Sequence, residues 1–161
     1  MTDDDIMTAA EAMEASAMPQ ARVVHCNDQT RATPEQLPLP KAVAKKPVGD
    51  KSPAEWAYER VILYLKNFEE QLDKDHEVAM GFTGSSAGIL RIEGLGYFDP
   101  DIITFYGSDE SGTRMQLIQN VAQLNVVLRA ISKNTPEEEP ARRIGFRLAQ
   151  NLGEGEETTE N

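Results

Sequence analysis

The chain has 161 residues and a mass of 17.8 kDa, with 16 basic and 27 acidic side chains, which gives a formal net charge of -11. This length accommodates one folded domain with tails, and the mean hydropathy of -0.47 argues against an integral membrane protein. The acidic start does not resemble a secretory signal, so we expect a cytoplasmic protein, and the single cysteine, Cys26, excludes an internal disulfide framework.

Composition predicts a disordered tail at each end of the chain. Residues 1–51 contain five prolines and no Phe, Trp or Tyr, so they cannot bury enough apolar surface to offset their conformational entropy. Within this segment, apolar residues at helical spacing predict a short helix over residues 3–17, which is either a frayed terminus or a segment that folds on a partner. Residues 149–161 contain four Glu and no Lys or Arg, which predicts an acidic disordered tail.

Residues 52–148 form the predicted folded domain, which begins with a helix. Ser52 provides a cap, Pro53 suits the first helical position, and Glu55 completes a capping box. Apolar residues then recur every three or four positions from Tyr58 onwards, which predicts an amphipathic helix of about 22 residues. We expect its apolar face to pack on the sheet of its own domain, and a short coiled-coil dimer is the alternative.

After this helix the apolar residues alternate, which predicts strands. Three strands are expected over residues 77–83, 89–93 and 102–106, with glycine-rich turns between them. A short fourth strand is expected over residues 113–117, although residues 113–118 also fit the start of a helix.

The remaining segments predict one more helix and one more strand. Apolar spacing predicts the helix near residues 118–131, and alternation predicts a closing strand over residues 142–148. The order is therefore α-β-β-β-(β)-α-β. It defines an α+β domain in which an antiparallel meander sheet is packed by two helices.

Patterns that carry catalysis or metal binding are scarce in this sequence. The glycine-rich segment 81–88 lacks the Lys that a phosphate-binding loop places after its last glycine, so a hairpin turn is favoured. His25 lies in the predicted tail, and His76 is the single histidine of the predicted domain. We therefore predict no catalytic residue, no metal and no cofactor, and an enzyme is a less favoured interpretation.

Two groups of residues are candidates for binding. Aromatic residues crowd the segment 96–107, and because adjacent residues of a strand face opposite ways, one ring of each pair is expected at the surface. A core ring beside a ring that covers the sheet edge is the alternative interpretation. The candidate partner-binding patch comprises Tyr97, Phe98, Phe105 and Tyr106. The candidate small-ligand site combines a turn with loop carboxylates and comprises Gly84, Ser85, Ser86, Asp99, Asp101 and Asp109.

Four blocks of the sequence resemble one known family. They are SPAEWAYER at residues 52–60, HEVAMGFTG at 76–84, GYFDPDIITFYG at 96–107 and QLIQ at 116–119. Over about residues 52–148 the chain resembles an uncharacterised family of small bacterial proteins, classed as a domain of unknown function. The resemblance implies a soluble bacterial domain with a variable N-terminal tail, and it brings no activity, ligand or catalytic residue with it.

These observations favour a non-enzymatic protein-interaction or assembly module whose partner is another protein or a second copy of the chain. A small-ligand-binding regulatory domain is the alternative. Nucleic-acid binding is disfavoured by the net charge of -11, because a phosphate backbone is held mainly by basic residues. The sequence leaves open the identity of the partner or ligand, the oligomeric state and the strand order.

Overall fold

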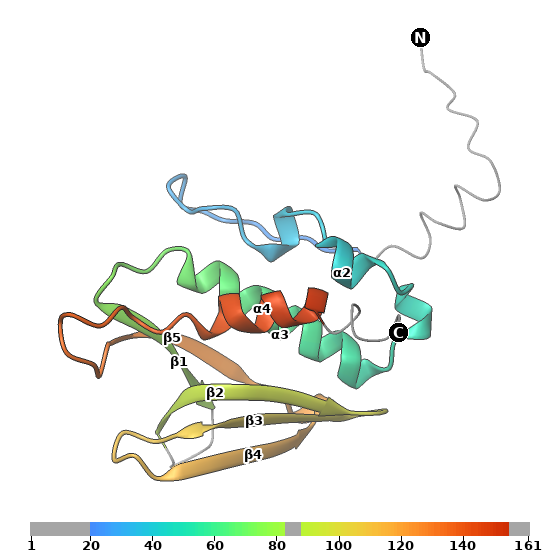
Figure 1. The fold of residues 1–161 in the computed structure, drawn as a ribbon. Coiled ribbons are helices and arrows are strands. Elements are labelled where there is room, and N and C mark those ends of the chain that lie inside the picture. The colour runs from blue at the N-terminus through green and yellow to red at the C-terminus, as the bar shows by residue number, and fades with distance from the viewer. Residues whose placement is uncertain (1–19, 83–87, 155–161) are drawn as a thin grey trace. The chain divides into compact units, whose positions relative to one another are not determined.

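The computed structural model describes residues 20–82 and 88–154 and divides the chain into two compact units, Met1–Lys51 and Ser52–Asn161 (Figure 1). In the first unit the described residues form three short helical turns, η1 (Pro34–Gln36), α2 (Lys41–Ala44) and η2 (Val48–Asp50). The helix predicted over residues 3–17 lies outside the described residues. The predicted disorder of residues 1–51 stays a prediction.

The second unit is an α+β domain with an antiparallel sheet, as predicted. Its strands are β1 (His76–Phe82), β2 (Ile89–Phe98), β3 (Ile102–Ser108), β4 (Arg114–Asn120) and β5 (Val126–Ser132). They form one five-stranded sheet in the order β4-β3-β2-β1-β5. Two helices, α3 (Pro53–Glu69) and α4 (Ile144–Glu154), lie together on one side of the sheet (Figure 1). None of the described helices has the length and apolar character that a membrane crossing requires.

The prediction of a second helix near residues 118–131 is wrong. These residues form the end of β4, the short turn η3 (Val121–Gln123) and most of β5. The apolar residues there fit a helical stripe, but Leu124, Val126 and Leu128 also alternate. All seven residues of β5 pair with β1, and this long-range pairing decides between the two patterns. The pairing also departs from a simple meander, because β5 joins the sheet beside β1.

The closing strand predicted over residues 142–148 is also wrong, because this segment enters helix α4 at Ile144. Ile144 and Leu148 are both buried and lie four positions apart, which suits one face of a helix as well as one face of a strand. Helix α4 continues to Glu154, so residues 149–154 belong to a helix and not to the predicted tail. The first helix, α3, is shorter than expected and has 17 residues.

The hydrophobic core lies between the sheet and the two helices. Among its fully buried side chains are Ile62 and Leu65 from α3, Met80 from β1, and Ile103 and Phe105 from β3. Strand β2 connects the two parts of the sheet, since Ile89 and Leu90 pair with β1 and the residues from Arg91 to Phe98 pair with β3, with a register shift between Ile92 and Gly94.

Helices α3 and α4 meet through a buried carboxylate and a glycine. Glu69, at the end of α3, is 2% exposed, and its Oε1 and Oε2 accept hydrogen bonds from the backbone N–H groups of Gly145 (2.8 Å) and Phe146 (3.1 Å). It thereby satisfies donors at the start of α4 that have no partner within that helix. Burial raises the pKa of Glu69, although these two hydrogen bonds act in the opposite direction. A Cβ on Gly145 would lie 2.7 Å from the backbone nitrogen of Lys66, so the helices pack backbone to backbone.

Candidate functional site

The side of β2, β3 and β4 that faces away from the helices forms a surface that we call the outer face. Ile103 and Phe105 of β3 point into the core, so their neighbours along the strand point outward. The strand register then places the following residues on the outer face: Arg91, Gly94, Gly96, Phe98, Ile102, Thr104, Tyr106, Ser108, Arg114, Gln116, Ile118 and Asn120. Among these residues only Arg91 and Arg114 carry a charge, and both lie opposite Ser108 at the end of the face remote from Phe98.

Three large side chains of the outer face are exposed to solvent. Phe98 is 75% exposed, Ile118 is 62% exposed and Tyr106 is 42% exposed. Sequence reasoning identified the two aromatic residues of this set. It missed Ile118, because the segment from residue 118 was assigned to a helix.

The predicted aromatic patch is divided between the two sides of the sheet. Phe105 is fully buried, and its ring meets the ring of Phe82 at a centroid distance of 5.1 Å. Tyr97 lies opposite Ile103 on the core side, and its ring packs against Tyr58 of α3, also at 5.1 Å. Only the other two members, Phe98 and Tyr106, lie on the outer face, and Tyr106 pairs with Gly94, four residues before Phe98 along β2.

Tyr106 has a structural partner in the strand beside it. A Cβ on Gly94 would lie 3.6 Å from the Tyr106 ring, and a Cβ on Gly96 would lie 3.8 Å from it. The ring thus lies over both glycines and covers backbone that would otherwise be exposed, a known way to stabilise glycine in a strand. Tyr106 matches the alternative interpretation of a ring lying over the sheet. The apolar surface of Phe98 remains largely open to solvent.

Two of the predicted ligand-site carboxylates lie at the turn between β2 and β3. Asp99 accepts a hydrogen bond from the hydroxyl of Ser52, the residue that caps α3. The Oδ2 atom of Asp101 accepts one from the side-chain amide of Asn120 at 3.1 Å. Both carboxylates therefore hold neighbouring segments of the domain in place.

The third carboxylate, Asp109, lies at the opposite end of β3. The seven residues of this strand span roughly 20 Å, so Asp109 is far from Asp99 and Asp101. Its Oδ1 accepts hydrogen bonds from the hydroxyl and backbone N–H of Ser111 and from the backbone N–H of Thr113, and these bonds hold its pKa below the usual value. The turn members of this predicted site, Gly84, Ser85 and Ser86, lie outside the described residues.

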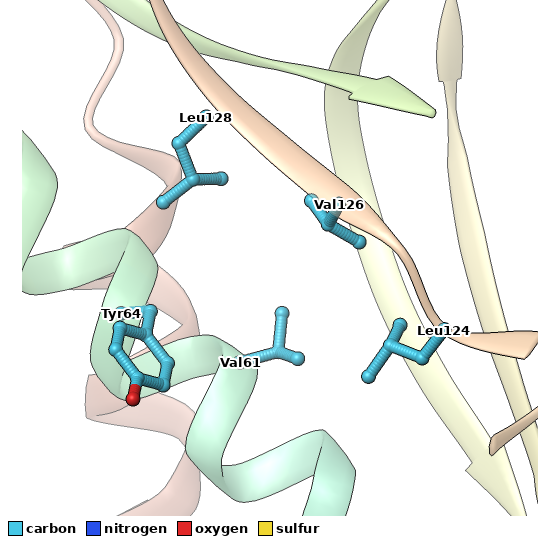
Figure 2. Close-up of a pocket in the computed structure, with 5 residues that line it drawn as sticks. All are labelled: Val61, Tyr64, Leu124, Val126 and Leu128. Carbon is cyan, nitrogen blue, oxygen red and sulfur yellow. The ribbon is translucent and has the colours of Figure 1, made fainter. Parts of the chain in front are cut away.

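An apolar groove that sequence reasoning missed lies between α3 and the β5 segment (Figure 2). It has a volume of about 360 Å³ and is lined by Val61, Tyr64, Leu124, Val126 and Leu128. The side chains on the two sides face each other across the space (Figure 2). The apolar residues at positions 124, 126 and 128 alternate in the sequence, which is the pattern of a strand. Because their spacing also fits a helix, the sequence prediction placed a helix there and missed the groove.

Buried titratable groups of the domain make structural contacts. Glu77 of β1 accepts a hydrogen bond from Arg91 at 3.2 Å and another from the backbone N–H of Arg142 at 2.8 Å. It therefore ties β2 and the segment before α4 to the same strand. Within residues 20–82 and 88–154, no group of three or more His, Cys, Asp or Glu side chains is arranged to hold a metal ion.

The fold and its surfaces define a small α+β domain with an outer face that exposes Phe98, Tyr106 and Ile118 and with an apolar groove. The chain belongs to a family described as "Family of unknown function (DUF6173)", whose model matches residues 51–147. This match confirms the family resemblance seen in the sequence blocks. No curated protein and no solved structure matches the chain.

Proposed function

We propose that the domain is a non-enzymatic protein-interaction module whose binding surface is the outer face. The observation that carries this proposal is the exposure of Phe98, Tyr106 and Ile118 on a face of an acidic chain where the strand register places no acidic residue and places charge only at the Ser108 end. Protein interfaces are depleted of charged residues at their centres and enriched in aromatic residues. The amide of Gln116 lies on the same face and supplies a polar group beside these apolar side chains.

Phe98 is the strongest candidate for the energetic centre of this surface. A partner that covers an exposed Phe side chain gains about 1.5–3 kcal/mol from the apolar area that it removes from water. The ring of Tyr106 already packs on Gly94 and Gly96, so less of its surface is available to a partner. The isolated domain gains little from Phe98, because three quarters of that residue is solvated.

The first test replaces Phe98 with serine. Phe98→Ser is expected to weaken partner binding about 30-fold, as expected for an aromatic hot spot worth about 2 kcal/mol. Its free energy of unfolding is expected to stay within about 0.5 kcal/mol of the wild type, because the side chain is exposed. Quantitative affinity capture from cell extract, followed by titration of the captured protein with each variant, measures the effect.

Val127→Ser is the matched control for this experiment. Val127 is an exposed apolar residue of the same sheet, 46% exposed, but it belongs to β5 and not to the outer face. We expect this variant to bind partners like the wild type. Equal binding by Phe98→Ser and Val127→Ser would contradict the proposed surface.

A small-ligand-binding domain is the second candidate, and the groove between α3 and β5 favours it. Binding pockets for small molecules usually have volumes of about 300–1,000 Å³ and mostly apolar walls. The groove falls at the lower end of this range, and none of its five lining residues is charged. Its walls therefore suit an uncharged, mostly apolar molecule, with the Tyr64 side chain as the polar element of the lining.

The test of this second candidate uses the uncharged fluorescent dye Nile red as a probe. Val61→Trp places a larger side chain in the groove and is expected to weaken dye binding at least about tenfold, since the added ring occupies the ligand volume. Val127→Trp adds the same ring on the other side of β5 and is expected to leave binding unchanged. Fluorescence titration measures both, and an unchanged affinity in Val61→Trp would exclude the groove as the site.

A further inference from the structure

The two edge strands of the sheet, β4 and β5, differ in how they are protected against pairing with another chain. Along any edge strand, backbone N–H and C=O groups at alternate residues point away from the sheet and can bind a further strand. Within the part of the chain that the structure describes, neither edge is covered by another strand. Natural proteins usually protect such edges with charges, prolines or bulges.

The β5 edge carries such protection. Arg129 lies at the midpoint of this strand and is exposed. If two copies paired antiparallel about this midpoint, the two Arg129 side chains would lie directly opposite each other, and like charges in that position are destabilising. In addition, the backbone carbonyl of Ser132 at the end of β5 accepts a hydrogen bond from Arg91. Pairing of β5 with itself is therefore disfavoured.

The β4 edge lacks this protection. Its sequence, RMQLIQN, contains no Pro, Lys or acidic residue, and its single charge belongs to Arg114 at the first position. The strand pairs with β3 in an unbroken register over all seven residues, so no bulge turns the edge aside. An edge of this length without a bulge, whose one charge lies at its first position, can accept an additional strand.

The β4 strand is also complementary to itself. When two copies are aligned antiparallel about Leu117, each Leu117 lies opposite the other, and Gln116 lies opposite Ile118 of the second copy. Arg114 then lies opposite Asn120 of the second copy, so no like charges meet. Ile118 of one copy also lies diagonally across from Ile118 of the other, within reach for apolar contact.

We propose that the β4 edge binds the β4 edge of a second copy of this chain, so that the two sheets join into one. This pairing uses the backbone edge of β4 and leaves Phe98 free, so it goes beyond the proposed function of the outer face. A pair of seven-residue strands is a small interface compared with the 1,200–2,000 Å² or so of stable complexes, so the dimer is weak and depends on concentration. Because each copy carries a net charge of -11, salt screens their repulsion and strengthens the dimer.

Sedimentation velocity on the full chain, over a range of concentrations at low and high salt, tests this proposal. As the protein concentration increases, the average mass of the wild type is expected to rise from 17.8 kDa towards twice that value. In high salt this rise is expected at a lower protein concentration. Ile118→Lys is expected to raise the dissociation constant at least about tenfold, because it places two ammonium groups diagonally across the pair. Val127→Lys, with the same charge on the other edge strand, is expected to have no effect.

Hydrogen exchange at the same concentrations locates the interface. The backbone amides of β4 are expected to gain protection as the concentration rises, whereas those of β5 are expected to be unaffected. A monomer at every concentration and salt, or a dimer that protects β5 and not β4, would overturn the proposal. Phe98 lies two strands from this edge, so Phe98→Ser is expected to leave self-association intact. Capture of other proteins through the outer face and pairing through β4 therefore fail or succeed separately.

Discussion

Gly107→Ala is expected to cost the domain more than about 4 kcal/mol of stability and to abolish the native pairing of β2 with β3. A Cβ at this position would overlap the backbone carbonyl oxygen of Arg91 and would lie 2.9 Å from a methyl group of Leu90. A side chain can rotate away from an added methyl group, but the β2 backbone is fixed by its pairing on both sides. The strands must therefore separate at the point where β2 connects the two parts of the sheet.

Equilibrium unfolding in urea, followed by circular dichroism, measures this effect. Gly153→Ala is the matched control, because a Cβ there meets nothing within 4 Å and the residue lies in helix α4. That variant is expected to be neutral or to gain up to about 1 kcal/mol, as alanine favours a helix over glycine. A Gly107→Ala chain that unfolds at the urea concentration of the wild type would show that the close approach of β2 and β3 is not required.

Glu69→Ala is expected to destabilise the domain by about 2–4 kcal/mol, since it removes two hydrogen bonds to a charged acceptor and leaves their donors in a buried position. The donors are the N–H groups of Gly145 and Phe146, which begin helix α4. Without these hydrogen bonds, α4 loses the contact that fixes its first turn against α3. The loss is expected as a lower urea midpoint.

Two further variants separate the hydrogen bonds from the charge of Glu69. Glu69→Gln keeps one carbonyl oxygen but turns an NH₂ group towards the second donor, so its destabilisation is expected to be smaller than that of Glu69→Ala yet measurable. Glu70→Ala changes the neighbouring exposed carboxylate and is expected to stay within about 0.5 kcal/mol of the wild type. Equal stabilities of Glu69→Ala and Glu70→Ala would contradict the role assigned to this carboxylate.

The parts of the fold that depend on local chemistry could be predicted from the sequence. The start of α3 is one example, because Ser52 caps the helix by accepting a hydrogen bond from the backbone N–H of Glu55 at 3.0 Å, as the spacing of these residues indicated. The strands β1 and β3 and the first half of β2 were predicted from alternation between turn residues, whereas β2 continues to Phe98, five residues beyond its expected end. In both cases the deciding interactions lie within a few positions of each other along the chain.

The parts of the fold that depend on distant partners could not be predicted. Leu124 and Leu128 lie four positions apart and fit a helix, yet both are also compatible with the alternation of a strand. Pairing with β1, more than 40 positions away, makes this segment a strand. No local sequence pattern indicates that pairing. The same dependence on distant partners explains why only part of the candidate site could be predicted. Phe98 could be identified from its neighbours, whereas Ile118 and the groove depend on strands β4 and β5.

The pairing of β1 with β5 has a consequence for how the domain opens and folds. Phe82 and Val126 are partners although 44 positions separate them, so their contact carries a larger loop-closure entropy than the hairpins formed by β2, β3 and β4. We therefore expect this pairing to form after the local hairpins, which reduce the effective length of the loop. Since β5 also supplies one wall of the groove, a fluctuation that releases this strand dismantles the groove while the outer face persists on its own hairpins.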